Sequence, residues 1–225
     1  MKESTMNNFP QYVYHYTTLK GLTGIISSSS ILFSSFAKSD DLRERVLNSD
    51  GYNYICFCYG EDAENKPAMW SKYADNSNGV CIKLNFTKLL ELNKEVADQI
   101  EHFPIKYENT KFLSTGQDYG HEMEYKNDNW SYQSEYRIIS KTVRSLVIDK
   151  DVIEHVVFVE TWENGIYKEI KDLTLLAGKC CFTILCRGEV KPLFPTVGPS
   201  IEWSEYVTKC GNIFERLKNN KTSQI

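Results

Sequence analysis

The sequence lacks the short motifs that mark the commonest nucleotide-dependent enzymes and hydrolases. Its 12 glycines form neither G-x-G-x-x-G nor G-x-x-x-x-G-K-[S/T], which excludes a dinucleotide-binding fingerprint and a P-loop. A G-x-S-x-G nucleophile elbow is also missing. These absences exclude the most familiar phosphate-binding loops and one large class of serine hydrolases.

Metal-binding patterns are equally scarce. The four histidines are scattered, and none has a second histidine at the spacing of a zinc ligand pair. Cys56-x-Cys58 and Cys180-Cys181 also lack the spacing of a structural zinc site. The seven cysteines are an odd number and lie mostly within apolar runs, which is typical of reduced, buried thiols. We therefore expect no metal site.

Long hydrophobic runs and a strong charge of one sign are missing too. Residues 21–37 carry no charge but are rich in serine, so they do not form a membrane span. Residues 1–10 lack the apolar core of a signal peptide. Lys and Arg number 26 against 30 Asp and Glu, and the net charge of −4 disfavours charge-driven binding of nucleic acid. We expect a cytoplasmic protein with no membrane partner.

The composition is that of an ordinary globular domain, with 41% hydrophobic and 25% charged residues. Hydrophobic patterns predict strands over residues 12–16, 31–33, 52–58, 80–84, 134–140, 153–159 and 181–186. Helical spacing and capping residues predict helices over residues 19–26, 42–47, 67–73 and 164–176. Short strands interspersed with short helices, without regular βαβ spacing, indicate an α+β fold.

Three segments are expected along the chain. Residues 1–11 form an N-terminal extension, residues 12–198 form the main domain, and residues 199–225 form an amphipathic helix with a polar tail. The apolar stripe of this last helix runs from Ile201 to Leu217. Such a stripe usually packs on its own domain, and the alternative is a docking helix for a partner protein.

Polar residues interrupt elements that otherwise have the pattern of a protein core. His15 lies within an aromatic strand, and Glu135 and Arg137 interrupt an apolar one, where they share a face. A carboxylate buried without a partner costs several kcal/mol, so Arg137 is an obvious partner for Glu135. One interpretation is therefore structural, with an ion pair and a core histidine, and the other is a functional site.

Three ordered blocks resemble a widespread bacterial family catalogued as a domain of unknown function. The blocks are Tyr14-His15-Tyr16-Thr17-Thr18-Leu19, then Met69-Trp70-Ser71-Lys72-Tyr73-Ala74-Asp75-Asn76 with Gly79-Val80-Cys81, then Trp130-Ser131-Tyr132-x-x-Glu135-Tyr136-Arg137. That family in turn resembles a divergent branch of the ADP-ribosyltransferase superfamily. The resemblance implies an ADP-ribosyltransferase-like split β-sheet core with short peripheral helices, and NAD as cosubstrate.

The resemblance also implies roles for individual residues. His15 matches the residue of the first strand that holds the ribose and adenosine side of NAD. Tyr73 matches the aromatic residue against the nicotinamide, with Trp70 and Phe57 as further ring walls. Glu135 matches the catalytic carboxylate that bonds the ribose 2′-hydroxyl, and Gln133 the residue that orients the acceptor. The full set expected on the NAD side is His15, Tyr14, Thr17, Phe57, Trp70, Ser71, Tyr73 and Arg137.

The sequence departs from the family pattern in three places. Relatives usually carry N-D-P-x-E after the second strand, whereas residues 40–44 here read D-D-L-R-E. The strand that ends Cys56-Phe57-Cys58 has Cys where relatives tend to have Ser, and Gln133 stands where a Glu is common. These changes leave the NAD-side residues intact and put the acceptor preference in question.

The leading hypothesis is an NAD-dependent mono-ADP-ribosyltransferase that modifies a protein or a nucleic acid. By analogy with the superfamily, it would be a bacterial toxin or an anti-phage effector, silenced by an antitoxin-like partner. The alternative is a nucleotide-binding module with the same fold and no turnover. A nuclease is a third class, disfavoured by the charge and by the lack of a metal-ligand cluster.

Overall fold

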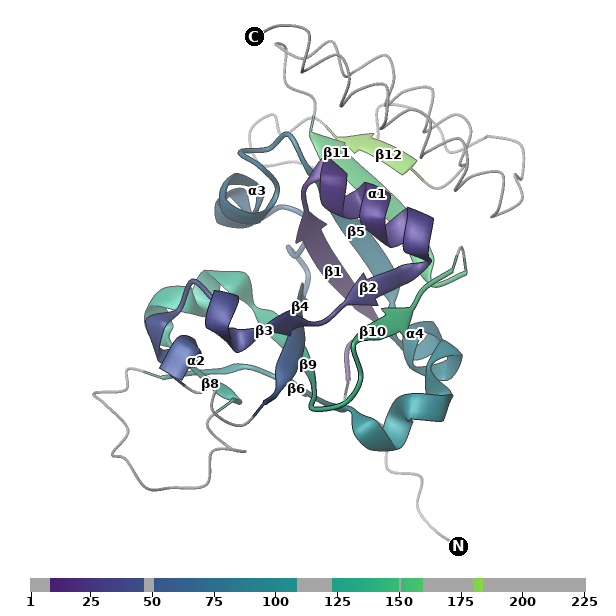
Figure 1. Cartoon of the computed structure of the whole chain (residues 1–225). Helices are drawn as coiled ribbons and strands as arrows, with labels where there is room; N and C mark the ends of the chain where they lie inside the picture. The colour runs from purple at the N-terminus through teal and green to yellow at the C-terminus, as the bar shows by residue number, and fades with distance from the viewer. Residues whose placement is uncertain (1–8, 47–50, 109–122, 150, 160–179, 184–225) are drawn as a thin grey trace, which may run out of the picture.

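The structure is a computed structural model of the chain and describes residues 9–46, 51–108, 123–149, 151–159 and 180–183 (Figure 1). The strands are β1 (Tyr12–Thr17), β2 (Ser30–Leu32), β3 (Ser34–Ser35), β4 (Asn53–Cys58), β5 (Val80–Asn85), β6 (Glu101–Pro104), β7 (Lys106–Glu108), β8 (Tyr125–Asn127), β9 (Glu135–Ser140), β10 (Ser145–Val147), β11 (Ile153–Val159) and β12 (Cys180–Thr183). The α-helices are α1 (Leu19–Ser28), α2 (Leu42–Val46), α3 (Pro67–Tyr73) and α4 (Phe86–Leu92), and the 3₁₀ helices are η1 (Phe36–Lys38), η3 (Lys94–Gln99) and η4 (Asp128–Gln133).

The main sheet has the order β12-β11-β5-β1-β4-β9-β6, and β3 pairs with β4. Its neighbouring strands are antiparallel except for β11 and β12, which run parallel. Two small sheets, β10-β2 and β7-β8, stand beside it. Mixed short helices and a largely antiparallel sheet match the α+β class that the sequence predicts.

Two well-paired halves of the main sheet meet along β1 and β4. Six residue pairs join β1 to β5, and six join β4 to β9. Between β1 and β4, the structure records a single pair, Tyr14 with Cys58. The first half of the sheet is therefore β12-β11-β5-β1 and the second is β4-β9-β6, and they are connected through one residue pair.

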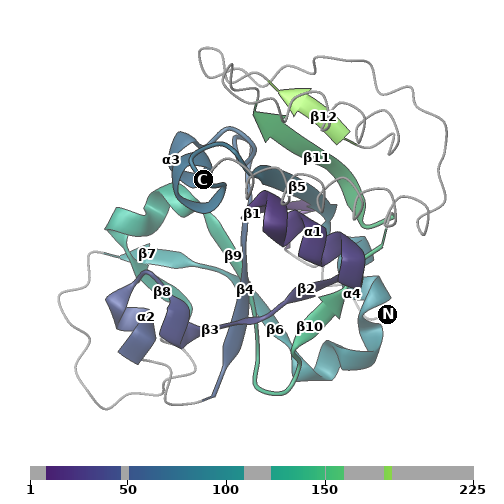
Figure 2. The same ribbon diagram turned by 45° about the horizontal axis from the view of Figure 1, so that its top comes forward.

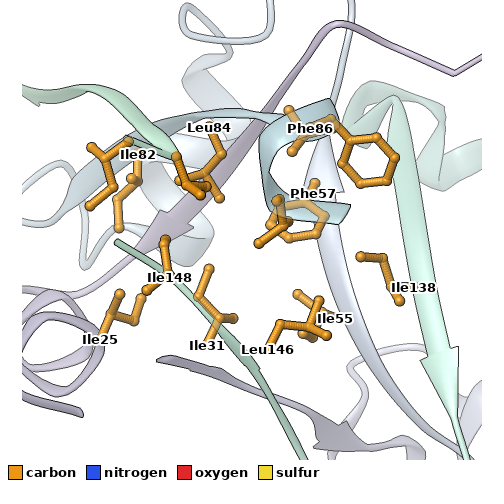
Figure 3. Packing of buried hydrophobic residues seen from close by; sticks show 14 of the residues in the cluster. Ile25, Ile31, Ile55, Phe57, Ile82, Leu84, Phe86, Ile138, Leu146 and Ile148 are labelled. Atoms are coloured by element: carbon orange, nitrogen blue, oxygen red, sulfur yellow. The ribbon is translucent and has the colours of Figure 1, made fainter. Parts of the chain in front are cut away.

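One face of the sheet packs under α1. Thr18 caps this helix by accepting a hydrogen bond from the backbone N–H of Gly21, 3.0 Å away. Its apolar stripe, Leu22, Ile25 and Ile26, belongs to a core that extends to β5, β9 and the β2-β10 ribbon (Figure 3). Figure 2 shows α1 lying across β1 and β5. The helical spacing of these apolar residues thus lets α1 cover this half of the sheet.

The opposite face packs against α3. Pro67 occupies the first turn of this helix, where its missing N–H costs nothing. Trp70 is fully buried, stacks edge-on against Tyr16, and donates its indole N–H to the carbonyl of Glu64 at 2.9 Å. These contacts fix α3, and with it Tyr73, beside the end of β1.

The side chains of β1 alternate between the two faces of the sheet. Val13 packs in the core under α1, while Tyr14 and Tyr16 pack in the cluster with α3. Period-2 alternation puts successive side chains on opposite faces, so the tyrosines share one face and Val13 and His15 the other.

Some predictions lie outside the described residues. The predicted helices 164–176 and 201–217 and the domain boundary at residue 198 fall there, and the predicted strand 181–186 overlaps β12 at residues 181–183. Cys56, Cys58 and Cys81 are free thiols, and Cys58 and Cys81 are buried. No helix in the described part is long and apolar enough to cross a membrane.

Candidate active site

A pocket of about 220 Å³ opens where β1 and β4 meet. Its walls come from β1, β4, α3, the segment from β2 to α2, and the ends of β8, η4 and β9. The first and third sequence blocks approach each other here, because Tyr14 pairs with Cys58 and Cys58 pairs with Glu135. Two segments that are far apart in the sequence are thus brought into one row of the sheet.

Six of the residues predicted for the site line this pocket: Tyr14, His15, Phe57, Tyr73, Gln133 and Glu135. Four others do not. Trp70 is buried behind the pocket wall and Arg137 lies beneath Glu135, while Ser71 is on the exposed side of α3 and Thr17 is at the end of β1. Direct contact of these four with a ligand stays a prediction that the pocket lining does not support.

Glu135 is the first residue of β9, and its side chain is almost completely buried, at 2% exposure. Its Oε1 accepts from Arg137 Nε at 2.6 Å and from the Cys56 thiol at 2.7 Å. Its Oε2 accepts from Lys126 Nζ at 2.6 Å. Both oxygens are therefore held in place by donors on β9, β4 and β8.

Glu135 belongs to a buried ion cluster with Glu44, Lys126 and Arg137. Arg137 Nη2 forms an ion pair with Glu44, which also lies 3.4 Å from Lys126 Nζ. Two carboxylates and two cations make the cluster neutral, which is the condition for burying charge at acceptable cost. The ion pair inferred from the sequence is thus present, and the carboxylate that it contains also lines the pocket.

The cluster keeps Glu135 ionised. Burial alone would raise the pKa of this carboxyl, but the charges of Arg137 and Lys126 outweigh it and lower the pKa from 4.5 to about 2. Burial raises the pKa of the Cys56 thiol, which donates to Glu135 as S–H. Cys56 is therefore a positioning contact and not a thiolate nucleophile.

His15 stands at the junction of the two sheet halves. Its Nδ1 lies 3.3 Å from the carbonyl oxygen of Cys56, and its ring meets Phe57 edge-on. Because a carbonyl only accepts, Nδ1 carries the proton. Burial lowers the pKa of His15 below 6.5, so the ring is neutral at pH 7. Nε2 is then a hydrogen-bond acceptor.

Gln133 and Tyr73 complete the wall opposite His15. Gln133 Nε2 donates to the Tyr73 hydroxyl at 2.7 Å, and Gln133 Oε1 accepts from Lys126 at 2.9 Å. At the rim, Lys72 forms an ion pair with Asp40 at 3.3 Å and lies over the Trp130 ring at 4.0 Å. Gln133 and Lys126 thus link the Tyr73 hydroxyl to the carboxylate of Glu135.

Sequence reasoning missed Lys126 and Glu44. Lys126 lies in a region without a clear local pattern, so nothing in the sequence indicated it. Glu44 did carry a signal, because it is the final Glu of the D-D-L-R-E segment that corresponds to N-D-P-x-E. Within the described residues, no group of three His, Cys, Asp or Glu side chains is placed to hold a metal ion.

Comparisons with known proteins give two findings. The profile of a protein family of unknown function, DUF2971, matches residues 69–138. Among solved structures, the chain is similar to Thermus sp. 2.9 DarT in complex with NAD⁺, at 9% identity and a TM-score of 0.38, over 72% of this chain and 87% of that chain. A comparison with curated proteins gives no match. The family match includes the positions of the second and third motif blocks.

Proposed function

We propose that the protein is an NAD-dependent mono-ADP-ribosyltransferase. The observation that carries the proposal is the meeting of His15, Gln133 and Glu135 at one pocket, with Glu135 held as a carboxylate. These are the residues to which the family resemblance gives NAD-side and catalytic roles. A sheet whose halves meet through one residue pair supports the split core that the resemblance implies.

The reaction breaks the bond between nicotinamide and the ribose C1′. NAD supplies the positively charged nicotinamide, which leaves with the electron pair of that bond. The acceptor's nucleophile forms the new bond to C1′ and releases a proton to solvent. Positive charge develops on the ribose as the bond breaks, so a fixed carboxylate nearby lowers the barrier.

The lining residues suit this chemistry. Glu135 has about four acceptor positions, of which three are filled by Arg137, Cys56 and Lys126, so one position is left for a ribose hydroxyl. His15 offers Nε2 as an acceptor for a second ribose hydroxyl. The phenols of Tyr14 and Tyr73 and the ring of Phe57 give an aromatic environment for the nicotinamide.

The proposal names the acceptor of ADP-ribose only by its chemical class. A protein side chain or a nucleobase would take up the ADP-ribose, and water would make the protein an NAD hydrolase. The roles as toxin or anti-phage effector, and the inhibitory partner, stay predictions from the resemblance.

A nucleotide-binding module without turnover is the second candidate, and one observation favours it. The charge of Glu135 is already matched by Lys126 and Arg137, which weakens the field that Glu135 would exert on a developing cation. Such a protein would bind NAD and leave it intact.

The test uses wild type, Glu135→Gln and Glu135→Asp with NAD labelled on the adenine side, alone, with lysate protein and with total RNA. Release of nicotinamide and transfer of label are followed together. Glu135→Asp keeps the negative charge in the ion cluster while it withdraws the carboxylate from the pocket, so it guards against loss of folding in Glu135→Gln. Glu91→Gln, at an exposed position of α4, is the matched control.

We expect both changes at Glu135 to lower transfer by at least about 100-fold, and Glu91→Gln to have no effect. Label on protein or RNA identifies the acceptor class. Nicotinamide without label transfer indicates an NAD hydrolase. Full activity in a folded Glu135→Gln protein removes Glu135 from catalysis, and NAD that is bound but never cleaved by wild type favours the binding module.

A further inference from the structure

We propose that Lys126 is a positioning residue that sets the direction of the hydrogen bonds around the pocket, so that the phenol of Tyr73 presents its proton to the bound ligand. The inference deepens the proposed function and rests on it, because the ligand is taken to be NAD. The group that would receive this proton is a hydrogen-bond acceptor, such as the carboxamide oxygen of nicotinamide.

The first step concerns the oxygen atoms that surround the Lys126 ammonium group. Its ammonium has three N–H donors and no acceptor. Three oxygens surround it, Glu135 Oε2 at 2.6 Å, Gln133 Oε1 at 2.9 Å and Glu44 Oε1 at 3.4 Å. The side chain is 5% exposed. Two of its donors are thus engaged in hydrogen bonds to Glu135 and Gln133, and the ammonium also forms an ion pair with Glu44, so Lys126 acts through the groups that it holds.

The second step is the orientation of the Gln133 amide. An ammonium can only donate, so the atom of Gln133 that faces Lys126 must be the carbonyl oxygen. The amide nitrogen is then directed to the Tyr73 hydroxyl, 2.7 Å away. Lys126 thus decides which end of the buried amide faces the pocket.

The third step is the direction of the Tyr73 hydroxyl. Its oxygen accepts from Gln133, so its own proton must go elsewhere. Among the described residues, no other hydrogen bond of this hydroxyl is recorded, and Tyr73 lines the pocket. Burial raises the pKa of Tyr73, which keeps the phenol protonated. The pocket therefore contains a neutral donor beside an ionised acceptor, Glu135.

Gln133→Glu reverses this direction without touching Lys126. A carboxylate at position 133 accepts from Lys126 and also from Tyr73, so the phenol proton turns away from the ligand. In the Gln133→Glu background, Tyr73→Phe therefore removes no hydrogen bond to the ligand. The hydrogen-bond direction in the wild type therefore predicts a strong coupling between positions 133 and 73.

The experiment is a double-mutant cycle of Tyr73→Phe and Gln133→Glu, read as the Kd of NAD by calorimetry and as KM and kcat for nicotinamide release. We expect Tyr73→Phe to weaken NAD binding about tenfold in the wild type, the loss of one hydrogen bond, and less than about twofold in Gln133→Glu. Equal effects of Tyr73→Phe in both backgrounds, or no effect in the wild type, overturn the proposal.

Lys126 itself is tested with Lys126→Met and Lys126→Arg. Lys106→Met is the matched control, because Lys106 on β7 is also paired with a glutamate, Glu124 at 2.7 Å, but is exposed and does not line the pocket. We expect Lys126→Met to lower kcat/KM about 100-fold, Lys126→Arg to recover part of the loss in kcat, and Lys106→Met to change neither constant. A folded Lys126→Met with unchanged kcat/KM overturns the proposal. If Lys126→Met does not fold, the cycle at positions 133 and 73 decides.

The outcomes separate this inference from the proposed function. A wild type that binds NAD without releasing nicotinamide overturns the transferase, while the coupling is still measured on Kd. A wild type that transfers ADP-ribose but shows no coupling overturns the inference alone. A wild type that neither binds nor cleaves NAD overturns both.

Discussion

Arg137 and Glu135 lie two residues apart on β9 and on the same face, with Arg137 Nε 2.6 Å from Glu135 Oε1. The arginine is fully buried below the pocket, and the glutamate lines the pocket. This contact is the ion pair that the structural interpretation expects. It also holds the Glu135 carboxylate at the pocket, where the functional interpretation requires it.

Arg137→Met should destabilise the protein strongly. The change leaves Glu135 and Glu44 with Lys126 alone and also removes the hydrogen bond from Arg137 to the carbonyl of Met123 at 3.0 Å. We expect a loss of about 3–5 kcal/mol in the free energy of unfolding, measured by urea denaturation. Arg144→Met, at an exposed position, should change it by less than about 0.5 kcal/mol. Similar losses for the two variants would contradict the role of the cluster.

The stability of the wild type should fall in acid because of Glu135. Its pKa is lowered from 4.5 in the unfolded chain to about 2 in the fold, so its contribution is complete above about pH 4.5 and is lost as the pH falls through about 2. Urea denaturation between pH 3 and 6 should show a steeper fall for wild type than for Glu135→Gln. Glu91→Gln serves as the control that keeps the slope of wild type. Parallel slopes for all three proteins would show that Glu135 is not held as a carboxylate.

Gly79→Ala should disrupt the turn that joins α3 to β5. A Cβ at this position would lie 2.3 Å from the carbonyl oxygen of Thr17 and 2.9 Å from the backbone of Ala74, and backbone atoms cannot rotate away. We expect a loss of at least about 2 kcal/mol in thermal or urea denaturation. Gly24→Ala is the matched control. Nothing lies within 4 Å of its Cβ and Gly24 is inside α1, so it should gain about 0.5–1 kcal/mol.

Leu42→Pro should be tolerated and should stabilise α2. Leu42 is the first residue of this helix and is 71% exposed, and the side chain of Asp41 caps the helix by accepting from Arg43 N at 2.9 Å. Proline suits the first position of a helix and restricts the unfolded chain, so we expect a gain of about 0.4–1 kcal/mol. Leu42→Ala should stay within about 0.5 kcal/mol of wild type. A loss for the proline variant alone would mean that the N–H of Leu42 is required.

The sequence predicts the elements whose patterns are local and long enough to complete a period. The aromatic strand β1, the helix α1 and the helix after Pro67 follow from such patterns and are confirmed. Between residues 86 and 129, the strands are short, with four residues in β6 and three in each of β7 and β8. Segments of that length do not present a clear periodicity, and so this region could not be predicted.

The sequence predicts only part of the site, because some of its residues are brought together by contacts that no local pattern encodes. His15, Gln133 and Glu135 came from motifs, and the structure brings them to one pocket. Lys126 depends on contacts with residues as distant as Glu44, which no local pattern encodes. The alternation of β9 placed Glu135 and Arg137 on one face, but not the second cation or the second carboxylate that make the cluster neutral.

The single residue pair between β1 and β4 also has a mechanical consequence. Each half of the sheet has its own complete ladders, and Tyr14 and Cys58 form the one backbone pair recorded between β1 and β4. His15 crosses the same boundary through its side chain, with Nδ1 3.3 Å from the Cys56 carbonyl oxygen, and residues of both halves pack in one apolar core. The two halves are therefore joined mainly by side chains, and side chains at this boundary can adjust to a ligand without breaking a strand ladder.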